Sequence, residues 1–434
     1  MTTPNKSTVE HKKEHYGDLR PKGSISYVKG SRVPPLVYAT IPQLLKQSVS
    51  QYGLRDALIF PNHRLSYYDF DRAVDALAIG FLALGLNKGD RLGIWSPNRL
   101  EWVLTQFATA RIGVVLVNIN PAYRLSELEY SLNKVGCKAL VLAKSFKSSE
   151  YLQMIRTLAP EIDTCCRGEL QATKLPNLRH VIVMDDVEGF AGLWSFEDIT
   201  ALGGSAEKLQ LIEIDKNLTP DDSINIQFTS GTTGQPKGAT LSHYNIVNNA
   251  SLTTDRIKLT EADRLAIPVP LYHCFGMVMG VLGAVSKGAA MVFPGEAFDA
   301  EQTLDTLAKE KCTALYGVPT MFVAMLQELD KRPRDLSTLR TGIMAGAPCP
   351  VEVMKKVNNQ MNMREVTICY GMTETAPVSF QSFVDDAIDK RCETVGRVHP
   401  HLEVKIVDGL GEIVSVGTAG EVCTRGYSVM KGYW

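Results

Sequence analysis

The chain has 434 residues, of which 45% are hydrophobic and 21% charged, and its formal net charge is −1. This composition is typical of a globular protein of two or three structural units and excludes a low-complexity chain. Because the net charge is close to zero, it gives no indication of nucleic acid or of an acidic membrane surface as a partner.

Residues 1–34, residues 265–286 and the nine cysteines indicate the cellular compartment in which the chain is expected. Residues 1–34 are polar and lack the apolar core of a signal peptide, so we interpret them as a flexible leader. Residues 265–286 carry no charged side chain, but prolines interrupt them, so we expect a buried core helix over Phe275 to Val285 and no transmembrane segment. The nine cysteines form no C-x-x-C pair and no zinc spacing, which is typical of a reducing intracellular compartment.

Residues 35–222 alternate predicted helices and strands. A helix over 42–49 follows the capping residue Thr40, and another begins at Ser66 and ends at Gly85. The strands that we predict are 91–95, 114–117, 139–142 and 181–184, with helices between them. This alternation predicts a parallel, doubly wound sheet. Residues 203–221 are expected to be mostly surface connection.

A polar loop of ten residues, TSGTTGQPKG at 229–238, follows a predicted strand over 224–228. Backbone N–H groups freed by glycine, several hydroxyls and the ammonium of Lys237 can together cradle a polyphosphate. A polar hairpin turn is the alternative. The loop is not a P-loop of the G-x-x-x-x-G-K-[ST] type, because Lys237 is followed by Gly238.

Residues 223–400, which include this loop, form a second block in which predicted strands alternate with helices. Its predicted strands are 289–293, 314–316, 341–345 and 366–370. Beyond Pro400, short strands separated by turns predict a small antiparallel β subdomain over 401–434. The strands that we expect in it are 403–407, 412–416 and 421–425.

The ten-residue loop closely resembles the phosphate-loop signature of the adenylate-forming superfamily, which includes acyl-CoA synthetases, luciferases and the adenylation domains of peptide synthetases. Further matching segments are LYHCFGM at 271–277, YGVPT at 316–320, AGAP at 345–348 and YGMTE at 370–374. The resemblance implies the large N-terminal domain of that α/β fold, in which two doubly wound subdomains are stacked and joined by a small antiparallel β subdomain.

The resemblance also implies which residues bind ATP and its cation. The expected nucleotide contacts are Thr229, Ser230, Gly231, Thr232, Thr233, Gly234, Gln235, Pro236, Lys237, Gly346, Ala347, Pro348, Tyr370, Gly371, Met372 and Thr373. Glu374 is expected to hold Mg²⁺, which proteins commonly bind through one or two carboxylates together with phosphate oxygens. A surface glutamate is the alternative. The expected catalytic residues are Lys237, Thr373, Glu374 and His273.

An acyl pocket is implied by the segment around His273. By resemblance, the pocket residues are His273, Phe275, Gly276, Met277 and Val318. His273 would act as a gate for the carboxylate substrate. A histidine with satisfied hydrogen bonds in the core is the alternative interpretation.

Over residues 24–434 the chain most resembles the acyl-CoA synthetase family member 2 type, which are medium-chain fatty acid–CoA ligases of mitochondria. Segments that carry this resemblance are SYV at 26–28, NPAY at 120–123, INIQF at 224–228 and TLSHYN at 240–245. It implies ATP, Mg²⁺, CoA and a fatty acid as cofactor and substrates. It also implies the mitochondrial matrix, or the cytoplasm if no transit peptide exists.

Members of this family continue past the equivalent of Trp434 to a ribose-binding aspartate, a hinge and a mobile C-terminal domain with a catalytic lysine. The printed sequence has none of these, so we expect it to correspond to the large N-terminal domain and to be poorly active alone. Two alternatives stay open. One is an adenylating enzyme with an acceptor other than CoA, and the other is a non-catalytic protein that binds nucleotide and acyl groups.

Overall fold

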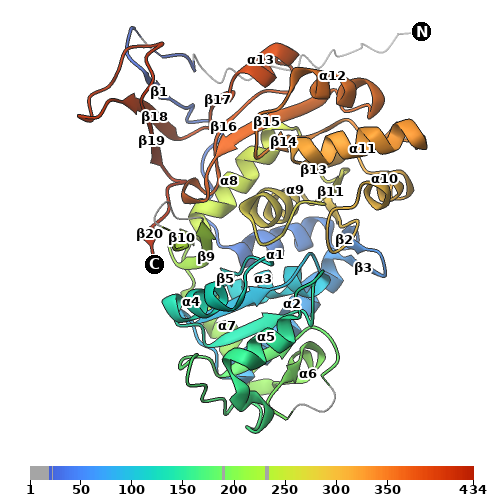
Figure 1. Cartoon of the computed structure of the whole chain (residues 1–434), viewed down its shortest axis with the longest axis vertical. Helices are drawn as coiled ribbons and strands as arrows, with labels where there is room; N and C mark the ends of the chain where they lie inside the picture. Colours follow the sequence, from blue (N-terminus) through green and yellow to red (C-terminus); the bar gives the residue numbers. More distant parts are fainter. Residues whose placement is uncertain (1–18, 22, 188–190, 230–233) are drawn as a thin grey trace, which may run out of the picture.

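The computed structural model describes residues 19–21, 23–187, 191–229 and 234–434. Within these residues, sheets of eight, nine and three strands organise the molecule. The eight-stranded sheet lies in the lower half of Figure 1 and the nine-stranded sheet in the upper half, with helices between and around them. Residues 230–233, in the middle of the expected phosphate loop, lie outside the described residues.

The eight-stranded sheet has the order β20-β10-β9-β5-β4-β6-β7-β8. It is parallel from β9 to β8, whereas β10 runs antiparallel to both β9 and β20. Its strands are β4 (Arg91–Trp95), β5 (Val115–Asn118), β6 (Ala139–Leu142), β7 (His180–Val183), β8 (Trp194–Ser195), β9 (Ser223–Thr229), β10 (Lys237–Ser242) and β20 (Gly432–Tyr433). Every residue of β6 is apolar and buried, as a parallel strand covered on both faces requires. The predicted parallel sheet is confirmed here.

The nine-stranded sheet has the order β17-β16-β15-β14-β13-β11-β12-β2-β3. Its centre is parallel, and the outer strands β3, β16 and β17 are antiparallel. Its strands are β2 (Asp56–Phe60), β3 (His63–Ser66), β11 (Arg264–Ala266), β12 (Ala290–Val292), β13 (Ala314–Gly317), β14 (Thr341–Ala345), β15 (Glu365–Gly371), β16 (Val378–Gln381) and β17 (Arg397–Val398).

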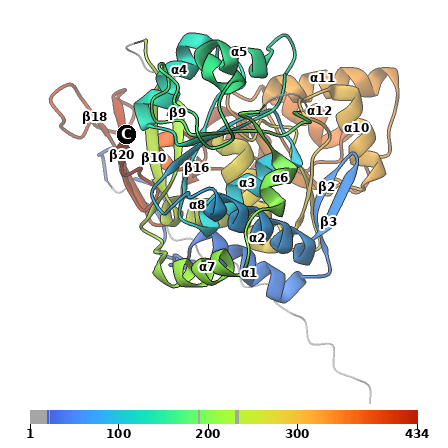
Figure 2. The same cartoon turned by 90° about the horizontal axis from the view of Figure 1, so that it is seen from below.

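The two large sheets do not follow the expected division at residues 222 and 223. β2 and β3 come from the first block of the chain but pair with β12 of the second block. Conversely, β9 and β10 come from the second block and join β5 of the first. Both views place β2 and β3 on the opposite side of the molecule from β18 and β20 (Figures 1 and 2).

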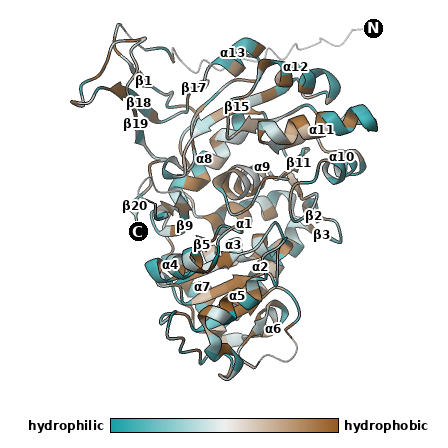
Figure 3. Ribbon diagram, viewed as in Figure 1, coloured by the Kyte–Doolittle hydropathy of each residue, from teal (hydrophilic) through white to brown (hydrophobic). Residues whose placement is uncertain are grey.

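Helices between the sheets form the largest apolar core. They are α1 (Ile41–Tyr52), α3 (Leu100–Arg111), α8 (His243–Arg256), the π-helical η2 (Phe275–Leu282) and α9 (Gly283–Lys287). Thr40 caps α1 as predicted, by accepting a hydrogen bond from the backbone N–H of Gln43. All residues of η2 are buried, which confirms a core helix in the uncharged segment. Apolar residues cluster in this central layer and in the sheet strands (Figure 3). Among the described residues, no helix has the length and apolar character needed to cross a membrane.

The remaining helices are α2 (Tyr67–Ala83), α4 (Leu125–Val135), α5 (Tyr151–Leu158), η1 (Pro160–Asp163), α6 (Phe196–Ala201), α7 (Ser205–Asn217), α10 (Ala300–Lys309), α11 (Pro319–Lys331), α12 (Val351–Gln360), η3 (Thr373–Thr375) and α13 (Ile388–Glu393). Of these, α2 adds its buried side chains to the same apolar core, and η3 contacts β10. The expectation of a surface connection at 203–221 was wrong, because α7 lies there. No residue of α7 is fully buried, so it lacks the apolar stripe that identifies a helix in sequence.

The three-stranded sheet consists of β1 (Tyr27–Lys29), β18 (Leu402–Val407) and β19 (Glu421–Gly426) in antiparallel order β1-β18-β19. This confirms the small antiparallel unit near the end of the sequence. The strand expected over 412–416 is not formed; that segment makes only isolated bridges through Ile413 and Ser415.

Candidate active site

The ends of the ten-residue loop lie side by side. Thr229 ends β9 and Lys237 begins β10, and the two residues are partners in the antiparallel ladder. The loop is therefore a hairpin connection between neighbouring strands. Gly234 and Gln235 are exposed, and Pro236 and Lys237 are partly buried.

Glu374 joins these two residues in what we call the charged cluster (Thr229, Lys237, Glu374 and Tyr433). It lies in η3, directly after the carboxyl end of β15. The Thr229 hydroxyl donates to Glu374 Oε1 at 3.3 Å, and the Tyr433 hydroxyl donates to the same oxygen at 2.8 Å. Lys237 Nζ lies 5.3 Å from the centre of the Tyr433 ring. The structure thus places the predicted phosphate-binding lysine and the predicted metal-binding glutamate against the same tyrosine.

Thr373, next to Glu374 in the chain, lies beside Cys274 of the segment around His273. The Cys274 thiol donates to Gln227 Oε1 at 3.0 Å. Burial raises the pKa of this thiol to about 12, so Cys274 is protonated at neutral pH and is no nucleophile. Cys274 and Gln227 lie within the segments LYHCFGM and INIQF that carry the resemblance, but sequence reasoning assigned no role to either residue.

A cavity of about 570 Å³ opens at the carboxyl ends of β14 and β15. Of the predicted nucleotide and acyl residues, Gly346, Ala347, Pro348, Tyr370, Gly371, His273 and Phe275 line it. Lining residues that sequence reasoning missed are Met279, Cys349, Ile368, Cys369, Pro377, Val378, Arg391, Cys392, Glu393, Thr394 and Val395. Open α/β sheets bind ligands at this end of their strands.

Glycine is required at two predicted positions of this region. A Cβ atom on Gly371 would lie 1.8 Å from the carbonyl oxygen of Pro377, and one on Gly276 would lie 2.3 Å from that of Pro270. Any side chain at either position would displace backbone. Gly276 therefore lets η2 approach the preceding loop and does not itself line the cavity.

Some predicted residues lie outside the lining of this cavity. Met277 points into a polar network, where its sulfur accepts hydrogen bonds from Asn118 Nδ2 at 3.1 Å and Gln227 Nε2 at 3.2 Å. Met279, two residues on, lines the cavity instead. Val318 lies behind the wall, where a Cβ on Gly346 would meet its Cγ1 at 3.2 Å. Lys237, Met372, Thr373 and Glu374 are also absent from the lining.

His273 is not a histidine sealed in the core. Its side chain is accessible through the cavity that it lines, yet the surrounding protein atoms desolvate it and lower its pKa below the usual value. Nδ1 accepts a hydrogen bond from the backbone N–H of Phe275 at 3.1 Å. The neutral ring therefore carries its proton on Nε2 and can donate a hydrogen bond to a bound oxygen.

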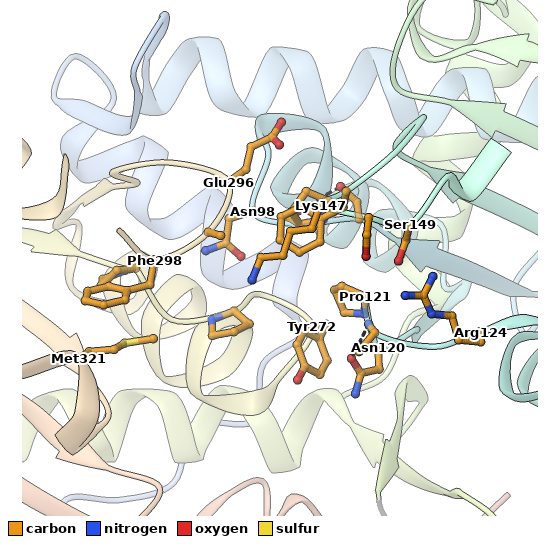
Figure 4. A pocket seen from close by; sticks show the side chains of 18 residues that line it. Asn98, Asn120, Pro121, Arg124, Lys147, Ser149, Tyr272, Glu296, Phe298 and Met321 are labelled. Carbon is orange, nitrogen blue, oxygen red and sulfur yellow. Dashed lines mark hydrogen bonds between the residues drawn. The ribbon is translucent and has the colours of Figure 1, made fainter. Parts of the chain in front are cut away.

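A second cavity, of about 520 Å³, lies at the carboxyl ends of β4, β5 and β6 (Figure 4). Its lining includes Ser96, Pro97, Asn98, Asn120, Pro121, Ala122, Arg124, Phe146, Lys147, Ser148, Ser149, Pro270, Tyr272 and Glu296. Figure 4 shows the side chain of Lys147 extending across it, with Arg124 at its edge. Tyr272 lines this cavity while His273 and Phe275 line the first, so the segment between them separates the two.

Comparison with known families matches residues 45–434 to the AMP-binding enzymes. The chain is 46% identical over 419 residues to the Danio rerio protein named medium-chain acyl-CoA ligase ACSF2, mitochondrial, covering 95% of this chain and 69% of the relative. The Homo sapiens protein of the same name is 42% identical over 422 residues, with 95% and 68% covered. The putative acyl-CoA synthetase YngI of Bacillus subtilis is 45% identical over 402 residues, with 92% and 73% covered.

Solved structures share the fold. The Mycobacterium smegmatis MbtA apo structure has a TM-score of 0.78 and 26% identity, and the match covers 92% of this chain and 69% of that chain. The anthranilate CoA ligase AuaEII in complex with anthranoyl-AMP has a TM-score of 0.77 and 24% identity, with 92% and 71% covered. The N-terminal domain of FACL13 from Mycobacterium tuberculosis has a TM-score of 0.76 and 24% identity, with 91% of each chain covered.

Proposed function

Because this chain belongs to the AMP-binding enzyme family, we propose that it is an AMP-forming ligase that joins a medium-chain fatty acid to CoA. The relatives named medium-chain acyl-CoA ligase support this substrate class, and the word mitochondrial in their names supports the mitochondrion as its compartment. One structural observation carries the proposal. Glu374 of the charged cluster is followed back along the chain by Thr373, which lies beside Cys274 in the segment that walls both cavities.

In the first half-reaction, a carboxylate oxygen of the fatty acid attacks the α-phosphorus of ATP, and pyrophosphate leaves. The adenine would lie against Tyr370 and Gly346 to Pro348 in the first cavity. Lys237 and the loop hydroxyls would stabilise the charge that spreads over the phosphates. His273 would donate from Nε2 to the substrate carboxylate and orient it for attack.

The donor set of the charged cluster fits Mg²⁺ bound together with a nucleotide. One carboxylate from Glu374 and one hydroxyl from Thr229 are adjacent, and Mg²⁺ typically takes its remaining ligands from phosphate and water. Among the described residues, no group of three or more acidic, cysteine or histidine side chains could hold a metal ion. When bound, the cation would supply positive charge at the phosphate oxygens.

In the second half-reaction, the thiol of CoA attacks the acyl carbonyl. A carbon–sulfur bond forms, the carbon–oxygen bond to AMP breaks, and the thiol proton passes to solvent. We place CoA in the second cavity, because Arg124 and Lys147 there can bind its phosphates. Neither cation forms an ion pair with another described residue, and Lys147 Nζ lies 5.4 Å from the centre of the Phe146 ring. The thiol arm would reach the first cavity past Tyr272 and His273.

Charge reversal at Lys147 tests this placement. Lys147→Glu should weaken CoA binding roughly tenfold, the size of one charge-assisted contact to phosphate, and leave ATP binding unchanged. Lys134→Glu, on the exposed end of α4, is a matched control with the same change in net charge. Calorimetric titration with CoA measures the effect, and pantetheine should show none because it lacks the nucleotide phosphates. Equal losses in both variants would contradict the placement, and no CoA binding at all would favour another acceptor.

A further inference from the structure

Tyr433 contacts both charged side chains of the charged cluster. Its hydroxyl donates to Glu374 Oε1 at 2.8 Å, and its ring faces Lys237 Nζ at 5.3 Å from the ring centre. Thr229 also donates to the same carboxylate oxygen. The oxygen that would bind a cation and the ammonium that would bind phosphate are therefore both engaged by one side chain.

The backbone around Tyr433 is firmly attached to the predicted phosphate loop and to η3. Tyr433 pairs with Ala239 in the β10–β20 ladder, and Trp434 N–H donates to the carbonyl of Gly238 at 2.8 Å. On the other side, Met430 N–H donates to the carbonyl of Glu374 at 2.9 Å. Tyr433 as a whole is 49% exposed, so its side chain can rotate away without opening the core.

The Tyr433 hydroxyl competes with a divalent cation for Glu374 Oε1, because Tyr433 and Thr229 both donate to that oxygen and together occupy its two lone pairs. Mg²⁺ takes oxygen ligands at about 2.0–2.1 Å, and its positive charge repels an O–H proton that is directed at the same oxygen. The cation–π contact likewise holds the Lys237 ammonium against the ring, where it competes with phosphate. A metal–nucleotide complex that binds Glu374 Oε1 and Lys237 therefore competes with both contacts of Tyr433.

We propose that Tyr433 is a positioning residue that ATP and its cation displace. Without nucleotide, it holds the Glu374 carboxylate and the Lys237 ammonium on the same side of β10 and keeps the two from pairing directly. On binding, the hydroxyl leaves Glu374 to the cation, and the ring releases Lys237 to the phosphates. This inference rests on the proposed function, because it assumes that the charged cluster binds a metal–nucleotide complex.

Tyr433→Phe separates the hydroxyl from the ring. The variant keeps the aromatic face for Lys237 and removes the competing hydrogen bond, so ATP binding in the presence of Mg²⁺ should tighten roughly three- to tenfold. ATP binding in EDTA should be unchanged, because no cation then competes for Glu374. In a Glu374→Gln background, Tyr433→Phe should have no effect on the Mg²⁺-dependent part of binding. All affinities are measured calorimetrically on the whole chain.

Tyr27→Phe is the matched control, since the Tyr27 hydroxyl also donates to a carboxylate, Glu403 Oε2 at 2.7 Å, but in the three-stranded sheet. Tyr27→Phe should change neither the affinity for ATP in the presence of Mg²⁺ nor the affinity for ATP in EDTA. Unchanged or weaker Mg²⁺–ATP binding by Tyr433→Phe, with normal binding by the wild type, would overturn this inference alone. Absence of ATP binding by the wild type under both conditions would overturn the proposed function and this inference with it.

Discussion

Glu374→Gln should lower the single-turnover rate of octanoyl-adenylate formation roughly 10²–10³-fold, the usual result of removing one positioned electrostatic group. Glutamine keeps the size of the side chain and can still accept from Thr229 and Tyr433, so the surrounding contacts should survive. The negative charge that would bind the cation is lost. Quenched samples of chain, ATP, Mg²⁺ and octanoate, separated by chromatography, give the rate.

Two comparisons make this result specific to the metal. Glu352→Gln removes an exposed carboxylate of α12 that pairs with Lys355, and it should leave the rate unchanged. Chelating Mg²⁺ in the wild type should lower the rate to the level of Glu374→Gln, and chelation should not affect the variant further. A Glu374→Gln rate within threefold of the wild type would show that the metal binds elsewhere.

Affinity for fatty acids should rise steeply with chain length. Each methylene buried against the apolar wall of the first cavity, which includes Phe275, Met279 and Ile368, should contribute about 0.8 kcal/mol, or roughly fourfold in affinity. Octanoate has about six methylenes more than acetate, so it should bind roughly 10³–10⁴-fold more tightly. Competition against a fluorescent fatty acid measures the series, and the gain should stop where the cavity ends.

A variant that shortens the cavity tests the same point. Met279→Trp adds volume to the wall, so it should weaken octanoate binding at least tenfold while butanoate, which ends short of it, changes little. Equal losses for the two acids would indicate general damage to η2. Equal affinity of the wild type for acetate and octanoate would show that the cavity does not bind the acyl chain.

The sequence was sufficient where a local pattern determines the structure. The strands Arg91–Trp95 and Thr341–Ala345 were predicted with their bounds, because each is a short run that is buried on both faces. Thr229 and Lys237 were expected to act together, and a hairpin between adjacent strands brings them side by side. The short distance between Thr229 and Lys237 along the chain is enough to predict that they lie close together.

Features that depend on distant parts of the chain could not be predicted in this way. The pairing of β2 with β12 joins segments more than 200 residues apart, and no local period encodes it. Met277 was predicted to line the cavity, but Met279 lines it instead. The π-helical winding of η2 shifts the faces of the helix and explains this difference. The contact of Tyr433 with Glu374 arises only when β20 pairs with β10.

The central claim is that one site binds the adenosine and acyl parts of an acyl-adenylate together. Calorimetric titration of the chain with a non-hydrolysable octanoyl-adenylate analogue, compared with AMP and octanoate separately, tests this directly. Because joining two bound parts removes the entropic cost of binding the second, we predict that the analogue binds at least ~100-fold more tightly than AMP and displaces both AMP and octanoate. An analogue that binds no more tightly than AMP, or that leaves octanoate bound, would contradict the claim.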